Sequence, residues 1–160
     1  MIEVRVDGLL VDNTQNSPVV LLREVDGDRV VPIYIGPFEA SAIAYALQET
    51  AFPRPMTLDL MRLAIEGLGG HVKRTVVTRL EEDTYYAEII IETPSRVLSV
   101  DARPSDSVGL ALRSGAPIFV SEDVMQKAGQ VVSSDDEQRI TELRGKLREI
   151  QPEDFGNFRM

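Results

Sequence analysis

The fold is decided by the stretch Ile33-Tyr34-Ile35-Gly36-Pro37-Phe38-Glu39-Ala40, in which an apolar strand runs directly into a helix. Pro37 has the fixed φ angle favoured at the first helical position. Glu39 follows in the first turn, where the helix dipole favours an acidic residue. Apolar residues then recur at helical spacing, which predicts a buried stripe formed by Ala40, Ile43, Ala44 and Leu47.

The segments on both sides of this stretch extend the pattern. Residues 19–25 and 29–35 are apolar, β-branched runs, and the Asp-Gly pair between them suits a tight hairpin. After the helix, Pro53-Arg54-Pro55 predicts an extended connector, because a residue before proline avoids the α region. Thr57 is the expected cap of a second helix, which runs through Leu58, Met61, Ile65 and Leu68 and ends at Gly69-Gly70.

The same order of expected strands and helices occurs a second time, with strands expected at residues 73–80, 84–92 and 97–102. The stretch Val100-Asp101-Ala102-Arg103-Pro104-Ser105-Asp106-Ser107 aligns with the first stretch, including the proline and the acid two residues later. We therefore predict an internal duplication. The expected fold is α+β, with two β-β-β-α-α halves whose strands form one curved, barrel-like sheet.

The end of the chain differs in composition from what precedes it. We place one core domain at residues 1–129, an acidic linker at 130–136, and a C-terminal amphipathic helix and tail at 137–160. This helix should present one apolar face, made of Ile140, Leu143, Leu147 and Ile150. Because a solitary helix of this length is unstable in water, the face should pack on the domain or on a second subunit, which makes a homo-oligomer an expectation.

Composition limits the classes of protein that the chain can belong to. Its 160 residues, 43% of them hydrophobic, are enough for one core. With no cysteine and one histidine, the chain offers neither a disulfide framework nor a thiolate zinc site, so a metal would be a hard ion bound by carboxylates. The chain has neither a signal-peptide pattern nor a long apolar run, which predicts a cytoplasmic protein with no membrane partner.

The net charge of −9 opposes nucleic-acid binding unless basic residues gather on one face. Much of the excess acid, however, falls outside the core domain, at Asp135, Asp136, Glu137, Glu149, Glu153 and Asp154. The core domain itself is therefore closer to neutral.

The densest polar segment, residues 101–107, lies where a strand gives way to a helix. Free backbone N–H groups there favour an anion, and Arg103 can grip a phosphate bidentately. Asp101 and Asp106 can hold Mg²⁺ or Mn²⁺ through carboxylate oxygens. The alternative is purely structural: Asp106 is a first-turn acid, Ser105 makes local hydrogen bonds, and Arg103 forms a salt bridge with Asp101.

Three further residues are candidates for the same site. Glu39 corresponds to Asp106 in the first half, and if the two helix starts face each other, Glu39, Asp101 and Asp106 form a carboxylate cluster able to bind a metal and activate water. Arg54 lies on an exposed connector, which suits either phosphate contact or plain solvation. Asp59 is either a first-turn acid or a metal ligand or general base. The sequence contains no phosphate-loop glycine signature, paired-histidine zinc motif or nucleophile elbow.

Four motifs together resemble the bifunctional nuclease family, in order and spacing, from Met1 to about Gly129. They are Val31-Pro32-Ile33-Tyr34-Ile35-Gly36 with Glu39-Ala40, Pro53-Arg54-Pro55-Met56-Thr57-Leu58-Asp59, Tyr85-Tyr86-Ala87, and Asp101-Ala102-Arg103-Pro104-Ser105-Asp106-Ser107. The resemblance implies a duplicated β₃α₂ fold with a barrel-like sheet and a nuclease activity on DNA and RNA. The chain departs from the family pattern at Leu58, where the usual segment reads Thr-His-Asp, so a potential base or ligand is missing.

The resemblance leads us to expect a nuclease that is assisted by a divalent metal and takes nucleic acid as its substrate. Asp101 and Asp106 are the expected metal ligands, Arg54, Arg103 and Ser105 the expected phosphate contacts, and Glu39 or Asp59 the expected base. The alternative is a non-enzymatic anion-binding or regulatory module whose C-terminal helix docks on a partner protein.

Overall fold

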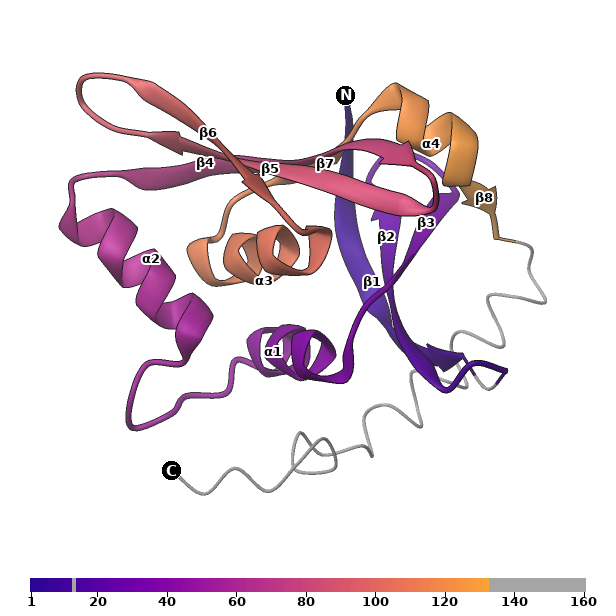
Figure 1. The fold of residues 1–160 in the computed structure, drawn as a ribbon, viewed down its shortest axis with the longest axis horizontal. Coiled ribbons are helices and arrows are strands. Elements are labelled where there is room, and N and C mark those ends of the chain that lie inside the picture. Colours follow the sequence, from indigo (N-terminus) through magenta and orange to yellow (C-terminus); the bar gives the residue numbers. More distant parts are fainter. Residues whose placement is uncertain (13, 133–160) are drawn as a thin grey trace.

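The computed structural model describes residues 1–12 and 14–132, which form an α+β fold with one mixed sheet of eight strands and four helices (Figure 1). The strand order in the sheet is β6-β5-β4-β7-β1-β2-β3-β8. The elements in chain order are β1 (Ile2–Asp12), β2 (Ser17–Glu24), β3 (Arg29–Tyr34), α1 (Pro37–Leu47), α2 (Thr57–Gly67), β4 (His71–Glu81), β5 (Thr84–Glu92), β6 (Val97–Ala102), α3 (Pro104–Ser114), β7 (Ile118–Val120), α4 (Glu122–Ala128) and β8 (Gln130–Val131).

Two antiparallel three-stranded groups, β1-β2-β3 and β4-β5-β6, are joined through β7. This strand pairs in parallel with β4 and antiparallel with β1. The predicted order β-β-β-α-α for the second half missed β7. This strand has only three residues after Pro117, which is too short to show an alternation of apolar and polar residues. β8 pairs with β3, so Gln130 and Val131 belong to the sheet although the boundary at residue 129 assigned them to the linker.

The helix starts follow the sequence signals closely. Pro37 and Pro104 occupy the first turns of α1 and α3, as predicted. In α2 the cap is Met56 rather than Thr57, and the Asp59 carboxylate accepts a hydrogen bond from the Met56 backbone N–H at 3.0 Å. The acid three residues on, rather than the threonine hydroxyl, thus satisfies the free donor.

The main core lies between the sheet and the helices. Alternate residues of the strands point into it, such as Val20 and Leu22 on β2 and Val31 and Ile33 on β3. α1 contributes Ala40 and Ile43, as predicted, whereas Leu47 of the predicted stripe is exposed. No helix among residues 1–12 and 14–132 is long and apolar enough to cross a bilayer.

Two predictions about architecture stay predictions. The two halves share a meander followed by helices, but an internal duplication is not established by that likeness alone. The acidic linker beyond Val132 and the C-terminal helix lie outside the described residues.

We expect Thr75→Val to stabilise the domain. Thr75 on β4 is fully buried and its hydroxyl has no hydrogen-bond partner, so the polar group is desolvated without compensation. Valine keeps the shape of threonine and removes that penalty, which should raise the free energy of unfolding by about 1 kcal/mol and the Tm by about 3 °C.

Thr78→Val is the matched control on the same strand. The Thr78 hydroxyl donates to the Tyr86 carbonyl at 3.3 Å, so its removal should lower the Tm. Thermal unfolding followed by circular dichroism measures both changes, and a lower Tm for Thr75→Val would contradict the prediction.

Candidate functional site

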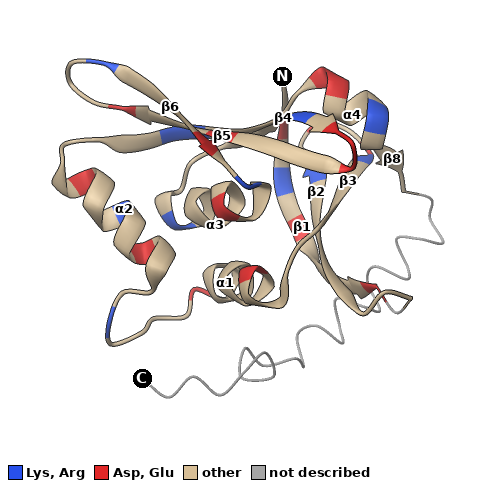
Figure 2. Ribbon diagram, viewed as in Figure 1, with Lys and Arg blue, Asp and Glu red and all other residues tan. Residues whose placement is uncertain are grey.

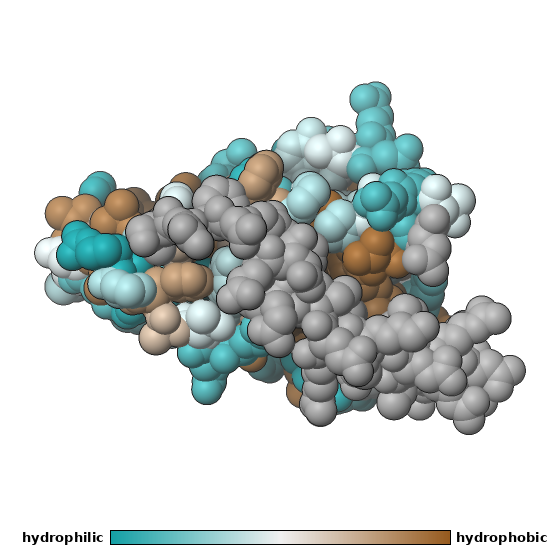
Figure 3. All heavy atoms as spheres, turned by 90° about the horizontal axis from the view of Figure 1, so that it is seen from below, coloured by the Kyte–Doolittle hydropathy of each residue, from teal (hydrophilic) through white to brown (hydrophobic). Residues whose placement is uncertain are grey.

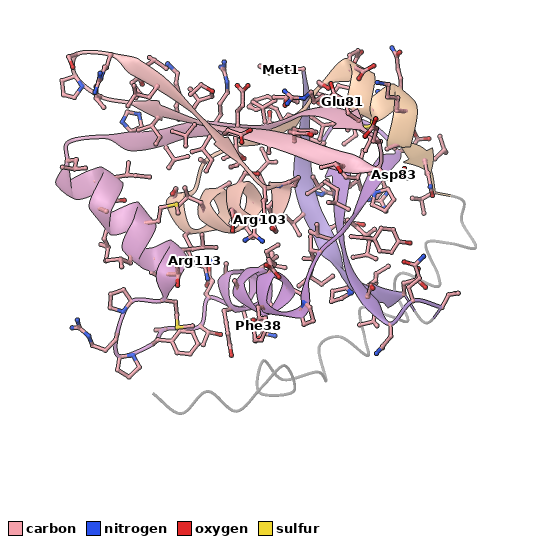
Figure 4. All side chains as sticks on the ribbon, viewed as in Figure 1. Met1, Phe38, Glu81, Asp83, Arg103 and Arg113 are labelled. Carbon is pink, nitrogen blue, oxygen red and sulfur yellow. The ribbon has the colours of Figure 1, made fainter. Side chains whose placement is uncertain are left out.

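Arg103 links the starts of two helices that are distant in sequence. It caps α3, and its guanidinium donates to both oxygens of Asp106 in the first turn of that helix, at 2.8 and 3.1 Å. It also donates to Glu39 Oε1, in the first turn of α1, at 2.9 Å. Figure 4 shows Arg103 lying between α3 and α1. The two helix starts therefore meet, a condition that the sequence analysis left open, and an arginine links them.

The electrostatics of this Glu39–Arg103–Asp106 cluster favour a permanent cation at its centre. The hydrogen bonds and charge of Asp106, followed by the hydrogen bond to Glu39, raise the pKa of Arg103 above its usual value. The Arg103 side chain as a whole is nevertheless 64% exposed. It is thus an oriented cation that solvent and ligands can reach.

Arg103 lies in the wall of a hollow of about 340 Å³. Glu39, Asp83 and Ser105 also line it, together with the aromatic rings of Tyr34 and Tyr85. The Tyr85 hydroxyl donates to the Pro32 carbonyl at 3.2 Å, and burial followed by the charge of Asp83 raises the pKa of Tyr85. The volume lies at the lower end of the range for small-ligand sites.

Asp101 lies away from this cluster. It is the cross-strand partner of Glu88, whose carboxylate accepts a hydrogen bond from Ser99 at 2.8 Å. The next residue, Ala102, packs with the core residues Val72 and Ile89 under α3. Because successive side chains of a strand point to opposite faces, Asp101 faces outward from the sheet. The expected convergence of Glu39, Asp101 and Asp106 therefore brings together only the first and the last.

Asp59 belongs to a second, more buried arrangement. Its Oδ1 accepts from Arg113 Nε at 2.9 Å, and its Oδ2 accepts from the Met56 N–H. Arg113 also donates to the carbonyls of Gly109 and Ala42, both at 2.9 Å, and only 8% of its side-chain surface is exposed. The guanidinium thus ties α1, α2 and α3 together, and Asp59 serves as its counter-ion.

Three other sequence positions can now be placed. Leu58 is buried, and a Cβ at Gly109 would lie 2.5 Å from its Cδ1, so the side chain fills the space left by that glycine. Arg54 is exposed on the connector, as predicted. Ser105 is buried in the first turn of α3, at the edge of the hollow.

The described part of the chain does not offer a ready site for the expected metal. Among residues 1–12 and 14–132, no three His, Cys, Asp or Glu side chains gather closely enough to hold an ion. The Arg103 guanidinium occupies the place between Glu39 and Asp106 that a cation would need. The residues as arranged therefore do not fit a divalent metal, and metal dependence stays a prediction.

Sequence reasoning missed several residues of these two arrangements. The only sequence feature that pointed to Arg113 was its position as a basic residue in the last turn of an expected helix. Tyr34, Asp83 and Tyr85 reach the hollow from β3 and the β4–β5 hairpin, which only the tertiary fold brings beside α3.

Comparison with models of protein families shows which family the chain belongs to. The model of the bifunctional nuclease domain matches residues 20–133, which is well over half of the chain. The chain belongs to the bifunctional nuclease domain family.

Individual relatives vary widely in similarity. An uncharacterized protein of Mycobacterium tuberculosis is 45% identical over 156 residues, covering 98% of this chain and 92% of that protein. Bifunctional nuclease 1 of Oryza sativa subsp. indica is 26% identical over 74% of this chain, which spans 37% of the plant protein. Bifunctional nuclease 1 of Arabidopsis thaliana is 24% identical over 78% of this chain and 39% of its own length.

The same substitution at the two ends of α3 should have different effects on stability. Arg113→Ala leaves a carboxylate and two carbonyls without their donor in a buried place, which we expect to lower the free energy of unfolding by about 3 kcal/mol. Arg103→Ala removes two exposed ion pairs, which together should cost about 1 kcal/mol or less. Urea denaturation measures both, and equal losses would contradict the distinction between the two arginines.

Proposed function

We propose that this member of the bifunctional nuclease domain family hydrolyses phosphodiester bonds of DNA or RNA in the cytoplasm, with Arg103 as the phosphate contact. The observation that carries the proposal is an oriented, solvent-accessible guanidinium in the wall of a hollow, within a domain of this family. Bidentate recognition by arginine suits phosphate oxygens in particular.

The hydrogen bonds of Arg103 leave capacity for a phosphate. A guanidinium carries five N–H groups. One N–H of each nitrogen is used, by Asp106 through Nε and Nη2 and by Glu39 through Nη1. One N–H on each Nη remains, so a phosphate oxygen can be bound while the two carboxylates keep the guanidinium in place.

The remaining groups have roles that follow from their positions. Glu39 is the proposed base: it takes a proton from water as the water oxygen bonds to phosphorus and the P–O bond to the leaving oxygen breaks, and that oxygen takes a proton from solvent. Asp106 positions Arg103, which stabilises the charge that develops on the phosphate. Tyr34, which is exposed beside the hollow, offers a ring on which a base can stack.

The distribution of acidic and basic residues indicates how the protein would contact a nucleic acid. In Figure 2 acidic and basic residues are interspersed over the described elements and do not separate into a basic face. The proposed binding therefore depends on a few local contacts rather than on a broad attraction to the phosphate backbone.

Dependence on Mg²⁺ or Mn²⁺ is a separate proposal, which the family resemblance supports and the arrangement of Glu39, Arg103 and Asp106 does not. A cleavage assay with each ion and with a chelator tests it directly. We assign no step of the reaction to a metal.

A second candidate function is an anion-binding or regulatory module without catalysis. It is favoured by Leu58, which packs on Gly109 where the family's usual segment supplies a histidine. It predicts that short oligonucleotides or phosphate bind at Arg103 and are not cleaved.

We expect highly purified protein to cleave single-stranded or double-stranded DNA or RNA, and Arg103→Ala to reduce the rate about 100-fold or more, the usual loss when a charge-stabilising donor is removed. Asp106→Asn should weaken cleavage because it loosens Arg103. Asp101→Asn is the matched control, since Asp101 faces away from the cluster and should leave the rate near that of the wild type.

The outcomes separate the alternatives. Cleavage unchanged in Arg103→Ala would point to a contaminating nuclease or another site and refute the assignment. Oligonucleotide binding that is lost in Arg103→Ala, with no cleavage by any variant, would favour the binding module.

A further inference from the structure

Helix α2 presents its apolar side chains to solvent. Leu60 and Leu63 of α2 are 58% and 44% exposed, and Leu68, which caps the C-terminal end of the helix, is 87% exposed, although a helix of a soluble domain normally turns its apolar stripe to the core. Of the eleven residues of α2, only Leu58 is buried. Met61 and Leu68, two of the apolar positions through which the sequence predicted this helix to run, are both exposed.

This outward face is continuous and carries no charge. At 3.6 residues per turn, Leu60, Leu63, Ala64 and Gly67 lie on one side of the helix, opposite the buried Leu58. Arg62 and Glu66 lie on the flank and bind each other at 2.9 Å, so their charges are already neutralised. Figure 3 shows hydrophobic residues gathered at the end of the molecule where α2 lies.

We propose that α2 packs antiparallel against α2 of a second copy of this chain, about a two-fold axis at Ala64. In that register Leu60 of each copy lies opposite Leu68 of the other. The same face of α2 therefore serves both copies. An isologous interface requires this property, since the same patch serves both subunits. The small side chain of Ala64 at the axis, with Gly67 about one turn away, lets the two helix axes approach to the lower end of the usual 8–10 Å range.

The second copy fits this face better than other occupants do. A charged partner would find no counter-ion on it. The described chain leaves the domain at β8, which pairs with β3 at the end of the molecule opposite α2, so no described residue has to move for a second copy to reach this face (Figure 1). Met61, which is 38% exposed and lies on the same side of the helix as Leu68, extends this apolar area.

The contact is small, because an eleven-residue helix is about 16 Å long. Two such helices with their flanks cover an area near the lower limit of stable interfaces. We therefore expect a dimer that forms at micromolar concentration and dissociates on dilution.

Sedimentation of the full chain should give about twice the monomer mass of 17.8 kDa at tens of micromolar. Leu60→Lys and Leu63→Lys each place a charge in the interface and should return the mass to that of the monomer. Val25→Lys is the matched control: Val25 is 41% exposed, close to Leu63, but it lies at the β2–β3 turn and should leave the dimer intact.

A crosslink tests the register independently of stability. The chain has no cysteine, so Ala64→Cys creates a single thiol at the proposed axis. Oxidation should link most of this variant as a disulfide dimer, since two Cα atoms about 4.4–6.8 Å apart can be bridged. Val25→Cys should give little dimer under the same conditions.

Three outcomes would overturn the proposal. They are a monomeric full chain at tens of micromolar, a dimer that survives both lysine variants, and an Ala64→Cys variant that crosslinks no better than Val25→Cys. The first would mean that residues 133–160, a different protein or nothing at all covers α2. None of these outcomes depends on nuclease activity.

Discussion

The whole arrangement depends on β7, three residues that pair with both groups of strands. Ile118, Phe119 and Val120 join β1 on one side and β4 on the other, which makes one sheet out of two meanders. Because β6 forms an edge of the sheet and β7 lies three strands inward, α3 must cross the sheet between them. Three strand spacings are about 14 Å, and an eleven-residue helix is about 16 Å long, so α3 fits this crossing with little slack.

The crossing of α3 explains why the domain has two arginine arrangements instead of one carboxylate cluster. The start of α3 lies beside the start of α1, where Arg103 meets Glu39. Its end lies beside α2, where Arg113 meets Asp59. Both guanidiniums donate through all three nitrogens, but the side chain of Arg103 is 64% exposed whereas that of Arg113 is only 8% exposed, so solvent and ligands can reach the remaining N–H groups of the first and not those of the second. Burial thus separates a group suited to ligand contact from one that holds the helices together.

The sequence predicted what depends on local spacing. Strand alternation, a hairpin at residues 25–28 and the two helix-start prolines are confirmed, although Gly27 is not among the residues with positive φ. Arg103 pairs with Asp106, three residues further on, rather than with Asp101, which the structural alternative named. The sequence did not predict contacts set by the tertiary fold, such as Glu39 with Arg103, 64 positions apart, or Asp59 with Arg113, 54 positions apart. Alternation would even place Asp101 and Arg103 on one face, but the strand ends at Ala102 and the turn into α3 re-aims Arg103.

The excess of carboxylate around Arg103 has a physical role of its own in the proposed activity. A lone exposed arginine samples many rotamers, and ordering it on a ligand costs about 2 kcal/mol of side-chain entropy. Asp106 and Glu39 impose that order in advance, which lowers the entropic cost of phosphate binding while their negative charge weakens the attraction itself. Such a cluster favours specific, geometrically defined contact with a single phosphate over strong binding to any polyanion, which suits a chain with a net charge of −9.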